Sequence, residues 1–191
     1  GYQLCKFLHE AGAKLLVSDI HVAAVARAEA KFGARIVAGK DIYNQDVDVF
    51  APCALGAELN SRTIPRLRAQ IVAGAANNQL KRAEDGAELA ARNILYAPDY
   101  VINAGGVINI TYERPIYDRE AAFRHIGGIY ETLTDLWRRA ERAGLAPEQM
   151  ADRIVEERLA AKRGLPKAQT ALAFAYYSGE GIAKDETKAS Q

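Results

Sequence analysis

A-P-D-Y-V-I-N-A-G-G-V-I-N-I-T-Y-E, residues 97–113, contains two apolar pieces separated by a break at residues 103–106. The first piece follows a Pro-Asp turn and reads as a strand, and the second runs from Val107 to Ile110. The paired glycines at the break would let another group approach the backbone closely, because neither residue has a Cβ. Asn103 adds a hydrogen-bond donor and an acceptor at the same place. Taken alone, the segment fits either an ordinary strand–turn–helix connection or a ligand site.

The sequence before this segment alternates between helical and extended patterns. Apolar spacing predicts helices over residues 1–10, 22–32 and 83–92. Short apolar runs predict strands over residues 15–19, 35–37, 47–50, 70–73 and 93–96. The joins are short, and this alternation predicts an α/β fold in which a parallel sheet is connected by crossover helices.

Small or amide residues follow three of the predicted strands in succession. They are Ala51-Pro52-Cys53-Ala54, Ala73-Gly74-Ala75-Ala76-Asn77-Asn78 and Ile102-Asn103-Ala104-Gly105-Gly106. The carboxyl ends of strands in an open α/β sheet share one edge, and ligands bind there. One such end could be only a tight loop with a buried Cys53, whereas three in series favour a site.

Asp19 follows the first predicted strand and has a possible role in this site. In dinucleotide-binding folds, an acid about 20 residues after the glycine loop accepts hydrogen bonds from the ribose. Gly1 precedes Asp19 by 18 residues, where the third glycine of G-x-G-x-x-G would fall. On this interpretation, the earlier glycines and the first strand would come before Gly1. An acid at this position repels a 2′-phosphate and therefore favours NAD over NADP. The alternative interpretation of Asp19 is a turn residue that is exposed to solvent and binds no ligand.

The composition argues against several other classes of protein. The chain has 191 residues, 49% of them hydrophobic, and a formal net charge of +1, so we expect neither a nucleic-acid nor a membrane partner. No 18-residue apolar run is present. The two cysteines, Cys5 and Cys53, have no metal-ligand spacing. We therefore expect no metal site and a reducing, cytoplasmic location.

Three segments together resemble one known family. A-P-C-A-L-G (51–56), A-G-A-A-N-N-Q-L (73–80) and A-P-D-Y-V-I-N-A-G-G-V-I-N (97–109) are similar to the NAD-binding domain of leucine dehydrogenases. These enzymes belong to the glutamate/leucine/phenylalanine/valine dehydrogenase superfamily. The resemblance covers residues 1–163 and implies a Rossmann-type, doubly wound, mostly parallel sheet that lacks its first strand. Helical patterns over residues 118–142 and 147–163 match the closing helices of that domain.

The resemblance also implies a role for each residue of the site. The residues expected to bind NAD are Gly1, Asp19, Cys53, Ala54, Leu55, Asn78 and Asn103. Val107 and Ile110 are expected to line the amino-acid pocket from one face of a helix. An apolar pair there disfavours a charged substrate side chain and accepts a branched aliphatic one, because an unpaired buried charge is costly.

The implied reaction is the NAD-dependent oxidative deamination of a branched-chain, leucine-like L-amino acid to a 2-oxo acid and ammonia. In this family, lysines and an aspartate in an N-terminal domain with a Gly-Gly-Gly-Lys segment carry out the chemistry. This sequence contains no such segment. We therefore expect the chain to be the cofactor-binding portion of a homo-oligomeric enzyme, to contain no catalytic residue, and to be inactive alone.

Residues 164–191 depart from the family and form a second predicted domain. Their pattern, which includes Y-S-G-E-G-I-A-K-D at residues 177–185, is similar to one Sel1-like repeat, a helical hairpin. Such repeats usually bury their faces against neighbouring repeats. The alternative function is therefore a non-catalytic nucleotide-binding or scaffold protein that uses this tail for protein interaction.

Overall fold

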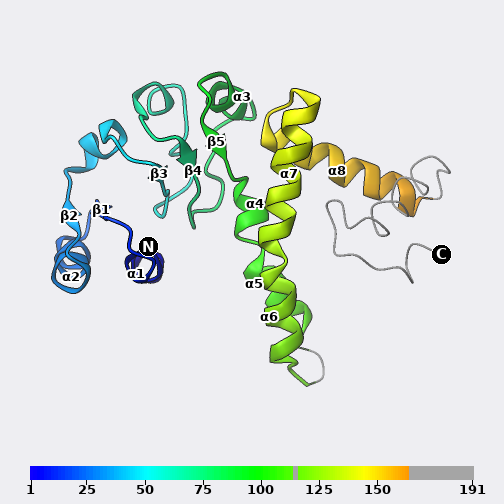
Figure 1. Ribbon diagram of the computed structural model, residues 1–191, viewed down its shortest axis with the longest axis horizontal. Helices are drawn as coiled ribbons and strands as arrows, with labels where there is room; N and C mark the ends of the chain where they lie inside the picture. The colour runs from blue at the N-terminus through cyan, green and yellow to red at the C-terminus, as the bar shows by residue number, and fades with distance from the viewer. Residues whose placement is uncertain (114–115, 164–191) are drawn as a thin grey trace. The chain divides into compact units, whose positions relative to one another are not determined.

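The computed structural model describes residues 1–113 and 116–163, which fall into two compact units (Figure 1). The first unit runs from Gly1 to Leu95, and the second begins at Tyr96. Helices and parallel strands alternate through the first unit, which confirms the predicted α/β class. The predicted Sel1-like repeat at residues 164–191 lies outside the described residues.

The first unit contains the predicted helices, with strands that are shorter than predicted. In chain order, its elements are α1 Tyr2–Glu10, β1 Leu16–Val17, α2 Val22–Phe32, β2 Arg35–Ile36, η1 Gly39–Asn44, β3 Val49–Phe50, η2 Ile64–Arg66, β4 Ile71–Val72, α3 Glu84–Ala91 and β5 Leu95–Tyr96. Left-handed backbone ends the first two helices, at Gly12 with φ +85° and at Gly33 with φ +62°. Glycine adopts this conformation without a steric penalty, which explains why both helix ends could be predicted from the sequence.

The strands form two short parallel sheets. β1 pairs with β2 in the register Leu16↔Arg35 and Val17↔Ile36. The other sheet has the order β3-β4-β5, with Val49 opposite Ile71 and Phe50 opposite Val72. β3 and β4 are parallel, so their carboxyl ends point the same way, as a site at one sheet edge requires.

Apolar side chains between the second sheet and the helices beside it form the core of the first unit. Leu59, Ile64, Val72 and Leu89 are all fully buried. On the other side of this unit, α1 packs against α2 through the rings of Tyr2 and Phe32, whose centroids are 5.1 Å apart.

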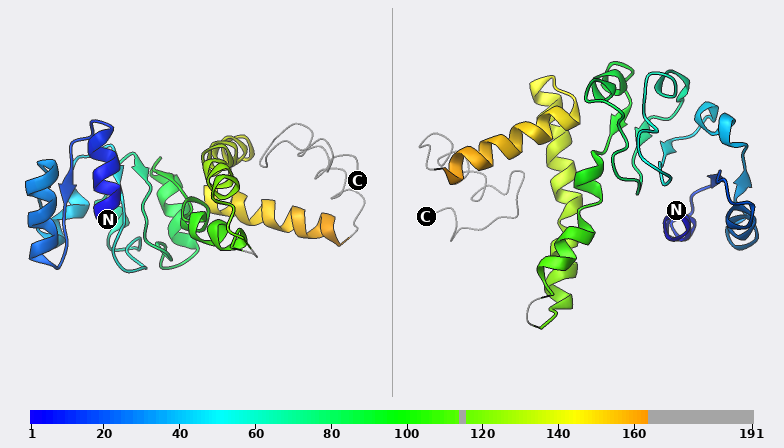
Figure 2. Two further views of the ribbon diagram at one scale, coloured as in Figure 1. Left: turned by 90° about the horizontal axis from the view of Figure 1, so that it is seen from below. Right: turned by 180° about the vertical axis from the view of Figure 1, so that it is seen from behind.

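The second unit is helical in its described part, with α4 Asp99–Ile102, α5 Gly105–Thr111, α6 Arg119–Gly127, α7 Ile129–Ala143 and α8 Pro147–Lys162. α7 packs against both α4 and α8, and α5 packs against α6 (Figures 1 and 2). The Trp137 indole N–H donates to the Tyr96 carbonyl at 2.8 Å, which ties α7 to the start of the unit. No helix among the described residues is both long and apolar enough to cross a membrane.

The strand expected after the Pro-Asp turn is wrong, because residues 99–102 form the helix α4. Pro98 immediately precedes the first turn, and the Asp99 carboxylate accepts the Tyr100 backbone N–H at 2.8 Å. An acid in the first turn of a helix accepts N–H groups that would otherwise lack partners. These local bonds outweigh the β-preference of the apolar residues that follow.

Two predictions about the closing helices also need correction. The single helix expected over residues 118–142 is divided at Gly127–Gly128, where the Gly128 N–H bonds the His125 carbonyl three residues back at 3.1 Å. The helical pattern of residues 147–163 predicts that Met150 and Leu159 both face inward. Met150 does so, with 3% exposure, but Leu159 is 47% exposed. Leu159 lies in the last turn of α8.

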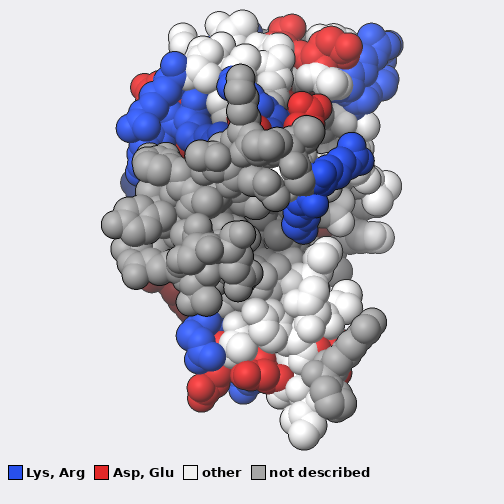
Figure 3. All heavy atoms as spheres, turned by 90° about the vertical axis from the view of Figure 1, so that its right-hand side faces the viewer, with Lys and Arg blue, Asp and Glu red and all other residues white. Residues whose placement is uncertain are grey.

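Charged side chains of both signs cover the outside of these helices. Glu157 of α8 bonds Arg139 of α7 at 2.9 Å and Arg153 of its own helix at 3.1 Å. Figure 3 shows basic and acidic side chains intermixed on the described part of one face. The three-residue network holds α7 and α8 together at their surface, where each ion pair contributes up to about 1 kcal/mol.

Candidate functional site

The loops that follow β3 and β4 are in direct contact. The Ala76 N–H donates to the Pro52 carbonyl at 2.9 Å. A Cβ added to Gly74 would lie only 2.2 Å from that same carbonyl oxygen. Position 74 therefore accepts only glycine without a backbone shift, and the contact brings the ends of two neighbouring strands together.

Gln79 holds the second of these loops in shape. Its side chain is fully buried, and its Nε2 donates to the carbonyls of Gly74 and Ala76, both at 2.9 Å. A buried amide that bonds two carbonyls of one turn leaves that turn little freedom. Sequence reasoning missed this role. The only signal was the position of Gln79 after a run of small residues, and its burial became evident only in the folded chain.

Asn78 positions the loop after β3. Its backbone is left-handed, with φ +53°, which asparagine tolerates better than most residues. Its carbonyl accepts the Ala57 N–H at 2.7 Å, and a Cβ on Gly56 would lie 2.7 Å from the same oxygen. The structure therefore brings Asn78 together with the loop that contains the predicted Cys53, Ala54 and Leu55.

The side chains of that loop face solvent. Cys53 is exposed, so the alternative of a buried structural cysteine is wrong. Leu55 is 87% exposed, an unusual position for a large apolar side chain. The loop is thus fixed at its base by Asn78 and open along its outer side.

Gly1 at the start of α1 lies beside the same loop. A Cβ built on Gly1 would be 3.6 Å from the Cys53 Cβ, an ordinary van der Waals distance. The first N–H groups of a helix have no partner within the helix and carry partial positive charge, so this end can bind an anion. The predicted phosphate position and the predicted adenosine loop are therefore adjacent.

Asp19 follows β1, which belongs to the β1-β2 sheet. Its carboxylate is exposed and accepts the His21 backbone N–H at 2.8 Å, directly before α2 begins. This bond is local and uses one of the carboxylate oxygens. Because the residue is exposed, its carboxylate can accept further hydrogen bonds.

The remaining predicted residues belong to the second unit. Asn103 is half-buried at the end of α4, so the third small-residue segment follows a helix and not a strand as predicted. Val107 and Ile110 lie on one face of α5 and are 70% and 62% exposed. They offer an apolar surface on a short helix that begins at the paired glycines.

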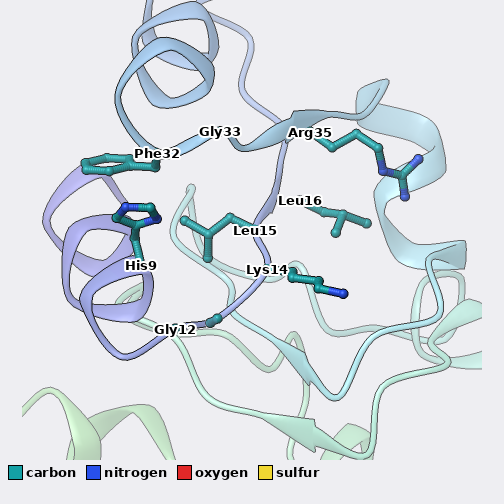
Figure 4. Close-up of a pocket in the computed structure, with 9 residues that line it drawn as sticks. His9, Gly12, Lys14, Leu15, Leu16, Phe32, Gly33 and Arg35 are labelled. Atoms are coloured by element: carbon teal, nitrogen blue, oxygen red, sulfur yellow. The ribbon is translucent and has the colours of Figure 1, made fainter.

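A separate cavity of about 500 Å³ lies at the amino end of β1. Figure 4 shows His9 and Phe32 facing one another on one side of it, with Lys14 and Arg35 across from them. The predicted site lies at the carboxyl strand ends, so this cavity is not part of it. Within residues 1–113 and 116–163, no group of His, Cys, Asp or Glu side chains could hold a metal ion.

Comparison with known proteins identifies the family. The sequence profile of the Glutamate/Leucine/Phenylalanine/Valine dehydrogenase family matches residues 7–115, more than half of the chain. Leucine dehydrogenase of Bacillus cereus is 50% identical over 159 residues, which are 83% of this chain and 43% of the relative. L-tryptophan dehydrogenase of Nostoc punctiforme is 48% identical over 170 residues, 88% of this chain and 48% of the relative.

Solved structures agree with the sequence matches. The crystal structure of L-tryptophan dehydrogenase from Nostoc punctiforme aligns with a TM-score of 0.80 at 47% identity, over 83% of this chain and 48% of that chain. A hetero-hexameric glutamate dehydrogenase from Thermus thermophilus aligns with a TM-score of 0.53 at 20% identity, which bears on the fold alone. The chain spans less than half the length of these relatives. On the profile match and these identities, the chain belongs to the glutamate/leucine/phenylalanine/valine dehydrogenase family.

Proposed function

We propose that this chain is the cofactor-binding portion of an NAD-dependent amino acid dehydrogenase. One observation carries the proposal: the glycine at the start of α1 lies against the exposed loop after β3, which is itself fixed to the loop after β4. An anion-binding helix end beside two strand ends in a parallel sheet suits the diphosphate and adenosine of a dinucleotide. Family membership supports the same assignment.

The strand order is also compatible with a Rossmann-type sheet. A doubly wound sheet of order 3-2-1-4-5-6 contains a pair formed by strands 2 and 3 and a row formed by strands 4, 5 and 6. The two sheets here, β1-β2 and β3-β4-β5, match that pair and that row in order, and the pairs β1–β2 and β3–β4 are parallel. The first strand of the order would stand between β1 and β3.

Different residues of the site bind different parts of the cofactor. Gly1 leaves room for the diphosphate at the end of α1, and Asp19 accepts hydrogen bonds from the adenosine ribose. Cys53, Ala54 and Leu55 line the adenosine side. Bound NAD supplies a hydride acceptor, and the chain's own contribution is to bind and orient it.

The second unit carries the residues that the proposal assigns to nicotinamide and substrate. The Asn103 amide is suited to hydrogen bonding with a carboxamide, since an amide both donates and accepts, and the Asn78 amide has the same capacity. The exposed pair Val107 and Ile110 favours an aliphatic, leucine-like substrate side chain over a charged one. The substrate is a small L-amino acid, and the full enzyme is a cytoplasmic homo-oligomer on this proposal.

NADH fluorescence titration of the Asp19→Ala variant tests the cofactor assignment. Hydrogen bonds to a charged carboxylate contribute about 1.5–3 kcal/mol, so the dissociation constant should rise roughly 10- to 100-fold. Asp46→Ala is the matched control, since Asp46 is an equally exposed acid in the connection before β3. Equal affinity in the wild type and the Asp19 variant would refute the role of Asp19, and no NADH binding by the wild type would refute the function.

A further inference from the structure

The two cysteines of the chain, Cys5 and Cys53, are far apart in sequence, but both lie near Gly1 at the start of α1. Cys5 lies in the first turn of α1, and its backbone N–H donates to the Gly1 carbonyl at 2.9 Å. Cys53 lies in the loop after β3, with its Cβ 3.6 Å from where a Gly1 Cβ would be. One helical turn, a rise of about 5.4 Å, therefore separates Cys5 from the residue that contacts Cys53.

The direction of helical side chains shortens this separation. In an α-helix, each Cα–Cβ bond tilts toward the N-terminus, so a side chain covers the turn that precedes it. The Cys5 side chain accordingly leans over the turn that begins at Gly1. Gly1 has no side chain to occupy that space, and Cys53 borders it.

The electrostatics of Cys5 agree with this arrangement. Burial raises the pKa of the Cys5 thiol, and the nearby charge of the Cys53 thiolate raises it further. A like charge acts in this way only at short range.

We propose that Cys5 and Cys53 form a redox-sensitive pair that hydrogen peroxide converts to an intramolecular disulfide. Both are free thiols here, and Cys53 is exposed to an oxidant in solvent. A disulfide needs Cβ atoms about 3.5–4.5 Å apart, so the proposal requires the exposed Cys53 loop to move toward Cys5.

The reaction proceeds in two balanced steps. The Cys53 thiolate attacks one oxygen of the peroxide, the O–O bond breaks, and a sulfenic acid and hydroxide form. The Cys5 thiolate then attacks that sulfur, an S–S bond forms, and the second hydroxide leaves. Protons from the two thiols convert both hydroxides to water. Loss of the Cys53 charge in the first step also removes one cause of the raised Cys5 pKa.

The disulfide would join the first turn of α1 to the loop after β3, across the space assigned above to the diphosphate and adenosine. This consequence rests on the proposed function. The oxidised chain should bind NADH at least about tenfold more weakly than the reduced chain, because the bridge fills the space that Gly1 leaves and holds the loop closed.

The test treats the full chain with hydrogen peroxide and measures intact mass, free thiols and disulfide-linked peptides. A loss of about 2 Da, no remaining free thiol and one peptide joining Cys5 to Cys53 would support the proposal. Cys5→Ser should instead accumulate sulfenic or sulfinic acid at Cys53, a gain of about 16 or 32 Da. The same peroxide adducts in the wild type, or disulfide-linked dimers, would overturn the intramolecular pair.

NADH titration before and after oxidation then separates the two ideas. Weaker binding that dithiothreitol reverses would support the cofactor consequence, and Cys5→Ser should show no reversible change. Unchanged binding in the oxidised chain would overturn that consequence while the disulfide stands. If the reduced chain binds no NADH, the proposed function fails, and the mass and peptide data still decide the disulfide.

Discussion

Replacing Gly74 with alanine should destabilise the contact between the ends of β3 and β4. The new Cβ would lie 2.2 Å from the Pro52 carbonyl oxygen, 2.4 Å from its nitrogen and 2.6 Å from its Cδ. Nonbonded carbon atoms normally stay about 3.5 Å or more from their neighbours, so the two segments must separate by about 1 Å. The obstacle is backbone and a proline ring, and neither can rotate out of the way.

The expected loss of stability follows from two terms. Overpacking of a buried site costs about 1–3 kcal/mol. Separation of the loops also weakens the hydrogen bond from Ala76 to Pro52, now 2.9 Å long, which contributes about 1 kcal/mol. The variant should therefore lose about 3 kcal/mol. With a urea dependence of about 2 kcal/mol per molar, the unfolding midpoint should fall by about 1.5 M.

Urea unfolding followed by circular dichroism measures this change, with hydrogen exchange of the β4 amides as a local readout. Gly39→Ala is the matched control in the same unit, because its Cβ would meet only the Ser18 hydroxyl, at 3.7 Å. That variant should unfold within about 0.5 kcal/mol of the wild type. If Gly74→Ala were as stable as Gly39→Ala, the close packing of the two strand ends would be refuted.

Two further predictions concern buried polar side chains. Gln79→Met keeps the side-chain volume but removes the amide that donates to the carbonyls of Gly74 and Ala76. The free energy of unfolding should therefore fall by about 2 kcal/mol. A loss below about 0.5 kcal/mol would show that the amide does not hold the loop. Burial raises the pKa of Glu148 above its ordinary value of 4.5, so the folded state holds more protons than the unfolded state between those two pKa values, and stability falls as pH rises through that window. Glu148→Gln removes this penalty and should unfold at a higher urea concentration than the wild type at about pH 7, with the difference vanishing near pH 4; the opposite pH trend would contradict the assignment.

Local chemistry explains why several elements could be predicted from the sequence. Gly33 ends α2 and Gly144 ends α7, both with left-handed backbone, and Pro147 begins α8. These signals act within one turn of helix and depend little on the rest of the chain. The spacing of Asp19 and Gly1 likewise led to their prediction as cofactor-binding residues, and the structure places Gly1 beside Cys53.

Long-range packing explains the rest. The apolar run at residues 99–102 carries no sign that it is helical until Asp99 bonds the Tyr100 N–H and α7 packs against it. The burial of Gln79 depends on how separate segments pack, and the tight approaches of Gly74 to Pro52 and of Gly1 to Cys53 join residues that are far apart in sequence. The sequence alone therefore determined the α/β class, the helix ends and the residue types at the strand ends, since these follow from local preference. Only the tertiary structure decided which strand ends touch and which side chains hold them, because those depend on how separate segments pack.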